Sequence, residues 1–216
     1  NGHYISTYTY SSTVNRGVFG CIGTSGIVKN LAIREQVGGD NSSGLAYSNA
    51  GTIAHCTVDS GNAKTVSNAI YNALDDKKEV SLDGGDQYGG IANTNTDSGK
   101  IIDCCVLGPM DVGALGQTAG GIAYSNSGTI ENCYFLGKIY NSRSKNDLSS
   151  AMAIVANNTG TVNNCYYLKY DDNTGVEGSS PLTAEQFESG EATYLLNNGR
   201  TGAAAVWRQN LTGNDD

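Results

Sequence analysis

An apolar pattern of eight residues recurs along the chain, each copy beginning at a glycine. Counted from that glycine, the second, fifth and seventh positions are apolar in every copy, with Val or Ile at the second and Cys or Leu at the fifth. The five copies are Gly26–Ile33, Gly51–Val58, Gly99–Val106, Gly128–Phe135 and Gly160–Tyr167. A single β-strand would alternate with a period of two. Because the step from the second to the fifth position breaks that period, the backbone must bend between them.

The residue at the fourth position of each copy identifies the bend. It is always Asn, Asp or His, the non-glycine residues that best tolerate left-handed backbone angles. The five are Asn30, His55, Asp103, Asn132 and Asn164. We therefore expect a positive φ at each of these bend residues.

A second short apolar strand precedes four of the five glycines. These segments are Leu45–Asn49, Ile91–Asn93, Ile122–Asn126 and Ile154–Asn158. Strand, turn, strand, bend and strand form one rung, which is too short to bury its own apolar face and must stack on the next. The pattern predicts an all-β fold, a parallel β-helix (β-solenoid) of about five recognisable repeats. The general preference of crossover connections predicts a right-handed coil.

The run from Gly120 to Tyr134, Gly-Gly-Ile-Ala-Tyr-Ser-Asn-Ser-Gly-Thr-Ile-Glu-Asn-Cys-Tyr, resembles the GLUG motif. This motif is a short repeat of bacterial surface and secreted proteins, also found in non-catalytic parts of some IgA-specific metallopeptidases. Four copies match well and the first loosely, over residues 17–168; Ala46 and Ala123 stand where the motif favours a small residue or Gly, a mild departure. The resemblance implies an extracellular or cell-surface bacterial module, a stalk or an adhesin that binds host or matrix glycan or protein. An accessory domain of a surface peptidase is an alternative.

Four of the six cysteines share the fifth position of the repeat: Cys56, Cys104, Cys133 and Cys165. Side chains stacked in register point the same way, and Leu31 takes this place in the first copy, so we expect a buried ladder of free thiols rather than disulfides. Thiols stacked one rung apart cannot surround a tetrahedral metal ion, so no metal is expected. Cys21 and Cys105 fall outside the ladder, and their state stays open.

Two segments depart from the repeat. The second and third copies are 48 residues apart, against 25, 29 and 32 elsewhere, and apolar residues at helical spacing predict an inserted helix over residues 63–78. This insertion is either a decorated loop or a binding element. Residues 1–170 are interpreted as the solenoid, with a strand in residues 1–16, and residues 171–216 as a helical C-terminal cap. Thr183 and Gln186 match a capping box, a second helix spans Glu191–Leu196, and Leu195, Leu196 and Trp207 are expected to plug the last rung.

Composition narrows the possible partners. The 216 residues carry a net charge of −8 with no basic cluster, which argues against nucleic acid. No apolar run approaches the ~20 residues of a membrane span. The chain begins at Asn1, and we expect a monomeric piece excised or processed from a larger surface protein, with glycan or protein partners and no cofactor.

Catalytic signatures are weak. The only histidines are His3 and His55, too few for a zinc-peptidase helix. The acidic clusters lack the spacing of a calcium loop and are interpreted as solvated turns; they are Asp75-Asp76, Asp83 with Asp86, and Asp171-Asp172. The remaining enzymatic alternative is a polysaccharide lyase or glycosidase whose loops bring such carboxylates together. We assign no catalytic residue.

Four tyrosines form the candidate binding face. Tyr134 and Tyr166 occupy one outward position in neighbouring rungs, while Tyr47 and Tyr124 share another. Exposed tyrosines among amide side chains suit sugar rings or protein contacts. The alternative is that these rings are ordinary strand residues partly covered by loops.

Overall fold

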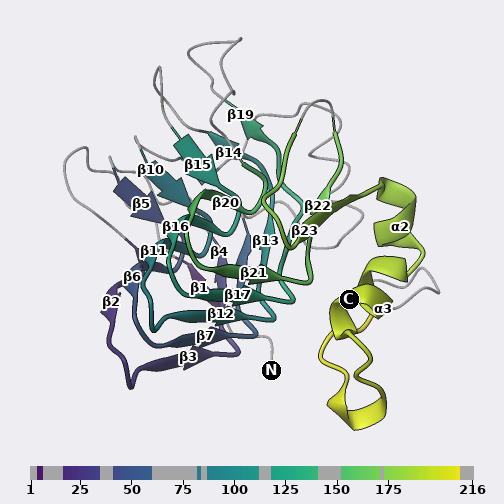
Figure 1. Cartoon of the computed structure of the whole chain (residues 1–216), viewed down its shortest axis with the longest axis horizontal. Helices are drawn as coiled ribbons and strands as arrows, with labels where there is room; N and C mark the ends of the chain where they lie inside the picture. The colour runs from purple at the N-terminus through teal and green to yellow at the C-terminus, as the bar shows by residue number, and fades with distance from the viewer. Residues whose placement is uncertain are drawn as a thin grey trace.

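The computed structural model describes residues 4–6, 17–34, 41–59, 82–83, 87–111, 118–140, 152–170 and 173–209. In this part of the chain every strand pairing is parallel, and successive turns of the chain stack into a coil (Figure 1). The predicted parallel β-solenoid is therefore confirmed. Its handedness stays a prediction.

Three long sheets form the walls of the coil. Sheet 1 contains, in spatial order, β1 (Tyr4–Ser6), β4 (Ala32–Arg34), β8 (Thr57–Asp59), β13 (Cys105–Leu107), β18 (Tyr134–Phe135), β22 (Cys165–Leu168) and β23 (Ser179–Leu182). Sheet 2 contains β2 (Phe19–Ile22), β6 (Ala46–Asn49), β11 (Ala92–Asn95), β16 (Ala123–Asn126) and β20 (Val155–Asn158). Sheet 3 contains β3 (Ile27–Lys29), β7 (Thr52–Ala54), β12 (Lys100–Ile102), β17 (Thr129–Glu131) and β21 (Thr161–Asn163).

Two shorter sheets, which the repeat pattern did not predict, complete the rungs. Sheet 4 contains β5 (Asn41–Ser43), β10 (Gln87–Gly89) and β15 (Thr118–Gly120), and sheet 5 contains β9 (Leu82–Asp83), β14 (Met110–Asp111) and β19 (Ile139–Tyr140). Glycines connect the strands of sheet 4 to those of sheet 2. Neighbouring rungs approach so closely at this turn that a side chain would not fit. A Cβ atom on Gly90 would collide with the carbonyl oxygen of Gly121 one rung away.

The interior is filled by the apolar positions of the repeat. At the second position Ile53, Ile101 and Ile130 pair in register along sheet 3, and all three are fully buried. The same core holds the ladder cysteines and the seventh-position residues Ile33, Val58, Val106, Phe135 and Tyr167. A slip of one residue would turn these side chains to the solvent, so burial of this core holds the rungs in register.

The bend residues adopt the left-handed conformation that their residue types predict. Their φ values are 56° for Asn30, 53° for His55, 52° for Asp103, 52° for Asn132 and 51° for Asn164. The bend does not interrupt the hydrogen bonding between rungs, since the backbone N–H of Asp103 donates to the carbonyl oxygen of Glu131 at 3.0 Å. The bend therefore joins sheet 3 to sheet 1 while the N–H of the bend residue stays paired with the next rung.

The C-terminal segment closes the coil in two steps. Residues 173–178 first cross the last rung, where Val176 packs on the core and the carbonyl oxygen of Gly178 accepts from the N–H of Cys165 at 3.2 Å. β23 then pairs with β22 at the edge of sheet 1, and Pro181 within it lacks the N–H that a further strand would need.

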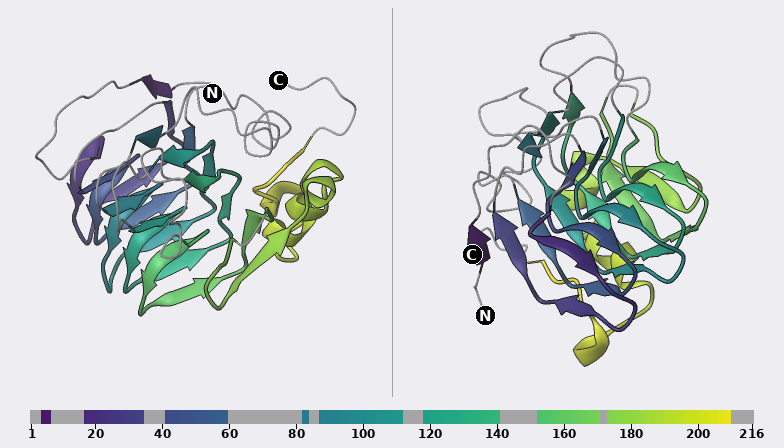
Figure 2. Two further views of the ribbon diagram at one scale, coloured as in Figure 1. Left: turned by 90° about the horizontal axis from the view of Figure 1, so that it is seen from above. Right: turned by 90° about the vertical axis from the view of Figure 1, so that its left-hand side faces the viewer.

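The helices α2 (Ala184–Glu188) and α3 (Glu191–Asn197), followed by a 3₁₀ turn at Gly202–Ala204, lie beside the strands of sheet 1 (Figure 2). The capping box of Thr183 and Gln186 is present. The expected plug is wrong in its position: Leu196 is buried, with Leu195 and Trp207 packed beside it, in a second cluster against the outer face of sheet 1. Val176 fills the place at the coil end.

Several predictions lie outside the described residues. They are the helix over residues 63–78, the strand over residues 7–16, His3, and the acidic positions 75, 76, 86, 171 and 172. Among the helices that the structure describes, none has the length and apolar character needed to cross a membrane.

Asn30 offers a clean test of the bend, because it is exposed and its side chain makes no hydrogen bond with the described residues. We expect Asn30→Val to lower the free energy of unfolding by about 1–2 kcal/mol, since a β-branched residue is strained at positive φ. Asn30→Gly, which accepts this φ, is the matched control and should change stability by less than about half of that. Urea unfolding of both variants measures the difference; equal stability of the two would contradict the strained bend.

Candidate functional site

The cysteine ladder lies inside the coil, as the sequence predicts. Cys56, Cys104, Cys133 and Cys165 are buried and free. The backbone N–H of Cys56 donates to Sγ of Cys104 at 3.4 Å, and that of Cys104 donates to Sγ of Cys133 at 3.4 Å. Each thiol donates in turn to the carbonyl oxygen two residues before it, at 3.2–3.3 Å. The sulfur atoms thus satisfy backbone groups that the bend turns inward, which is a structural role.

A second ladder of side chains was missed in the sequence. Four strands of sheet 2 end in an asparagine: Asn49, Asn95, Asn126 and Asn158. The Nδ2 atom of each of the first three donates to Oδ1 of the next at 2.8 Å. The first three are fully buried. Asn49, Asn126 and Asn158 each stand two residues before an anchor glycine, a signal that could have identified them, while Asn95 stands four residues before Gly99.

The tyrosines of sheet 1 differ in exposure. Tyr134 and Tyr166 pair in register, as expected, but Tyr134 is only 8% exposed. Its ring packs 5.0 Å from the ring of Trp207 and 6.0 Å from that of Phe187, and burial raises its pKa well above the ordinary value. The prediction that Tyr134 belongs to an exposed binding face is therefore wrong, because the C-terminal helices cover the outer side of the last rungs.

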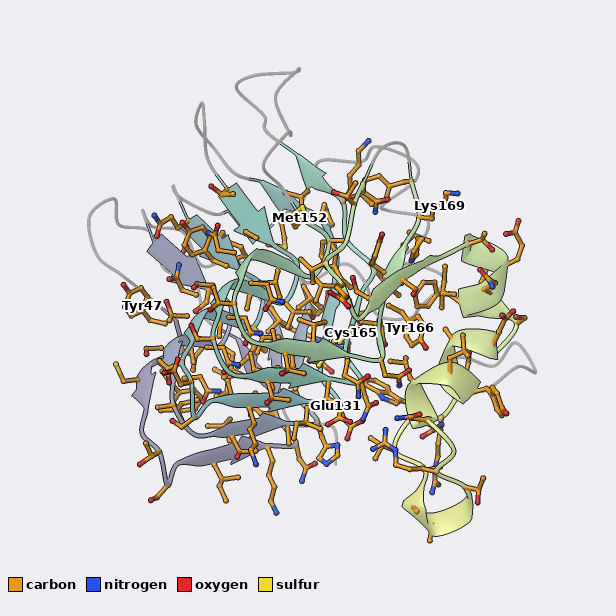
Figure 3. The ribbon with its side chains drawn as sticks, viewed as in Figure 1. Tyr47, Glu131, Met152, Cys165, Tyr166 and Lys169 are labelled. Carbon is orange, nitrogen blue, oxygen red and sulfur yellow. The ribbon has the colours of Figure 1, made fainter. Side chains whose placement is uncertain are left out.

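The other two tyrosines lie on sheet 2, away from this cluster. Tyr47 on β6 and Tyr124 on β16 are partly exposed, and Asn93 on β11 stands between them in the register. Tyr47 and Tyr166 project from different sides of the coil (Figure 3). The four tyrosines do not form one surface.

An ion pair fastens the C-terminal segment to the middle of the coil. Both oxygens of the bend residue Asp103 accept from the guanidinium of Arg200, at 2.9 and 2.6 Å, although the two residues are 97 positions apart. The carboxylate is 4% exposed, with His55 Nδ1 3.9 Å away, and hydrogen bonding to it raises the pKa of Arg200. Because the Asp103 carboxylate is engaged in this way, its role is to hold the segment in place.

The bend of the last rung, β23 and the end of α3 enclose an open pocket of about 270 Å³. Its lining consists of Asn163, Asn164, Cys165, Tyr166, Gly178, Ser179, Ser180 and Asn198. None of these residues carries a carboxylate or a basic group, so the pocket offers hydroxyl and amide groups beside one aromatic ring. Of the predicted tyrosines, Tyr166 alone lines it.

The described residues contain no group of three His, Cys, Asp or Glu side chains placed to hold a metal ion. Asp83 lies on β9, paired with Asp111 of β14 in the register of sheet 5. Comparisons with protein-family models, with curated protein sequences and with solved structures find no match. The resemblance to the GLUG motif therefore stays a prediction.

The burial of the thiols predicts their reactivity. Because a reagent reaches exposed thiols first, and burial raises the pKa of Cys105 to about 11, which disfavours the reactive thiolate, we expect one fast-reacting thiol in the native protein, the exposed Cys21. A thiol reagent at neutral pH should find six reactive groups after unfolding. A disulfide between any two ladder cysteines in a peptide mass map would contradict the ladder.

The Asp103–Arg200 pair predicts a measurable coupling. Arg200→Met leaves a buried carboxylate unpaired and should cost about 1–3 kcal/mol of unfolding free energy. Arg208→Met, at an exposed arginine of the same segment, is the matched control and should be nearly neutral. In urea unfolding, the loss should shrink when Arg200→Met is combined with Asp103→Asn. Equal losses for the two arginine variants would show that the ion pair does not fasten the segment.

Proposed function

We propose that this chain is a non-catalytic module of a bacterial cell-surface or secreted protein, serving as a stalk or as an adhesin-type binding unit. The observation that supports it most is the continuity of the side-chain ladders through the coil. The four rungs that contain Cys56, Cys104, Cys133 and Cys165 carry both ladders of buried side-chain hydrogen bonds, which suits a stiff spacer that holds other parts of a protein away from a surface.

The outer faces of the coil support a non-catalytic role. General acid–base catalysis requires titratable groups within hydrogen-bond reach of one scissile bond. In sheet 3 the outward position that bears Glu131 is occupied by Ile102 in the rung before and by Asn163 in the rung after. The carboxylate of Asp103 is bound by Arg200. At this position of sheet 3 no two neighbouring rungs therefore present carboxylates, whereas in sheet 5 Asp83 and Asp111 do occupy paired positions.

The cysteines are compatible with an oxidising, extracellular location. Parallel side chains on stacked rungs keep their Cβ atoms about 4.8 Å apart, whereas a disulfide requires Cβ atoms about 3.5–4.5 Å apart and side chains that turn toward each other. The ladder thiols, each held by hydrogen bonds on its own rung, are therefore poorly placed to form disulfides with one another. The resemblance to the GLUG motif supports the same location, either in a stalk or in the accessory part of a surface peptidase.

The proposal predicts no turnover of polysaccharides or peptides. The purified chain is incubated with a panel of neutral and acidic polysaccharides and with denatured protein, and released products are measured by reducing-end assay and mass spectrometry. We expect a rate equal to that of buffer. Cleavage that disappears in Asp83→Asn or Asp86→Asn, but persists in Asp97→Asn as a control on an exposed turn, would overturn the proposal and favour a glycan-active enzyme.

A further inference from the structure

We propose that the pocket between the last rung, β23 and the end of α3 binds one ring of a neutral saccharide. The inference deepens the proposed function, on whose non-catalytic binding role it rests, by naming a site and a class of ligand. It starts from the composition of the lining, which joins one tyrosine ring to amide and hydroxyl groups and contains no acidic or basic side chain.

The position of the tyrosine ring is determined by its neighbours. The hydroxyl of Tyr166 donates to Oδ1 of Asn164 at 2.7 Å, while Nδ2 of Asn164 donates to Oδ1 of Asn132 at 2.8 Å and to the carbonyl oxygen of Leu195 at 3.0 Å. This network ties the ring to both the coil and α3. A ring held in advance loses little conformational entropy when a ligand packs on it, and the C–H face of a sugar suits an aromatic surface.

The polar groups around the ring are available for hydrogen bonding. Within the described part of the chain, the Ser180 hydroxyl and the side-chain amide of Asn198 make no hydrogen bond, and the side chain of Asn163 has only a long one, 3.5 Å to Glu131. Amide and hydroxyl groups both donate and accept, which matches neighbouring hydroxyl groups of a sugar. The volume of about 270 Å³ lies below the roughly 300–1,000 Å³ typical of drug-sized ligands, so it suits a single ring whose neighbours extend into solvent.

Two other ligand classes fit less well. An anion, including a uronic acid, finds no basic side chain in the lining, and Asn198 directly follows the C-terminus of α3, whose carbonyl groups carry partial negative charge. A peptide that adds a strand to β23 meets Pro181, which has no N–H to donate. A neutral saccharide avoids both obstacles.

Calorimetric titration of the purified chain with neutral oligosaccharides (gluco-, galacto-, manno- and N-acetylglucosamine series) and with a uronate oligosaccharide tests the site. We expect at least one neutral series to bind and the uronate not to bind. Ser180→Ala and Asn198→Gly should each weaken binding about 3–10-fold, as the loss of one hydrogen bond does. Asn198→Gly keeps the positive φ of 48° at the end of α3 accessible.

Asn30→Gly, the same substitution at a positive φ at the other end of the coil, is the matched control and should leave binding unchanged. Binding that neither pocket variant weakens, preferential binding of the uronate, binding only of extended peptides, or no binding at all would overturn the site. Cleavage of the bound saccharide would instead overturn the non-catalytic function and leave the site intact, so the two failures are distinguishable.

Discussion

The structure depends on the left-handed residue at the fourth position of each repeat. This single backbone conformation turns the chain between sheets 3 and 1 and thereby places the second, fifth and seventh side chains in one interior. Because the bend occurs at the same point of each rung, every rung can pair with the next in the same register. Because Asn, Asp and His tolerate a positive φ better than other non-glycine residues, the chain adopts this conformation at five positions without glycine.

The stacked register in turn produces the ladders. The inward N–H of one rung donates to a cysteine sulfur atom of the next rung, and stacking in register lets the following rung make the same contact. The asparagines of sheet 2 form an equivalent ladder with their side-chain amides. Buried polar groups must find partners, and here the repeat supplies the partner automatically. The ladders therefore reinforce the register that created them.

The periodic part of the molecule could be predicted from sequence, while the non-periodic part could not. The bend, the buried thiols and the capping box follow from local spacing and residue type. Tyr134 was misjudged as exposed, since its burial depends on Phe187 and Trp207, which no repeat position relates to it. The pairing of Arg200 with Asp103 across 97 residues and the packing of Val176 at the coil end could not be predicted either. Contacts made by a segment without repeats produce no periodic pattern in the sequence.

The C-terminal segment does not follow the repeat, and together with the last rung it lines the described pocket. The helices α2 and α3 cover the outer face of sheet 1 at its last rungs. The pocket lies where this segment meets the final bend. The proposed binding site and the closure of the coil thus depend on the same segment.

The register itself can be measured most directly by distances between spin labels attached at Thr52, Thr129 and Thr161, which occupy one outward position of sheet 3 in rungs two, four and five. In a Cys21→Ser background, pairwise labelling at introduced cysteines and electron paramagnetic resonance give the separations. The account predicts that they grow by about 4.8 Å per rung, so that Thr52–Thr129 spans two rungs and Thr52–Thr161 three. Separations that do not follow this order would contradict the stacked register.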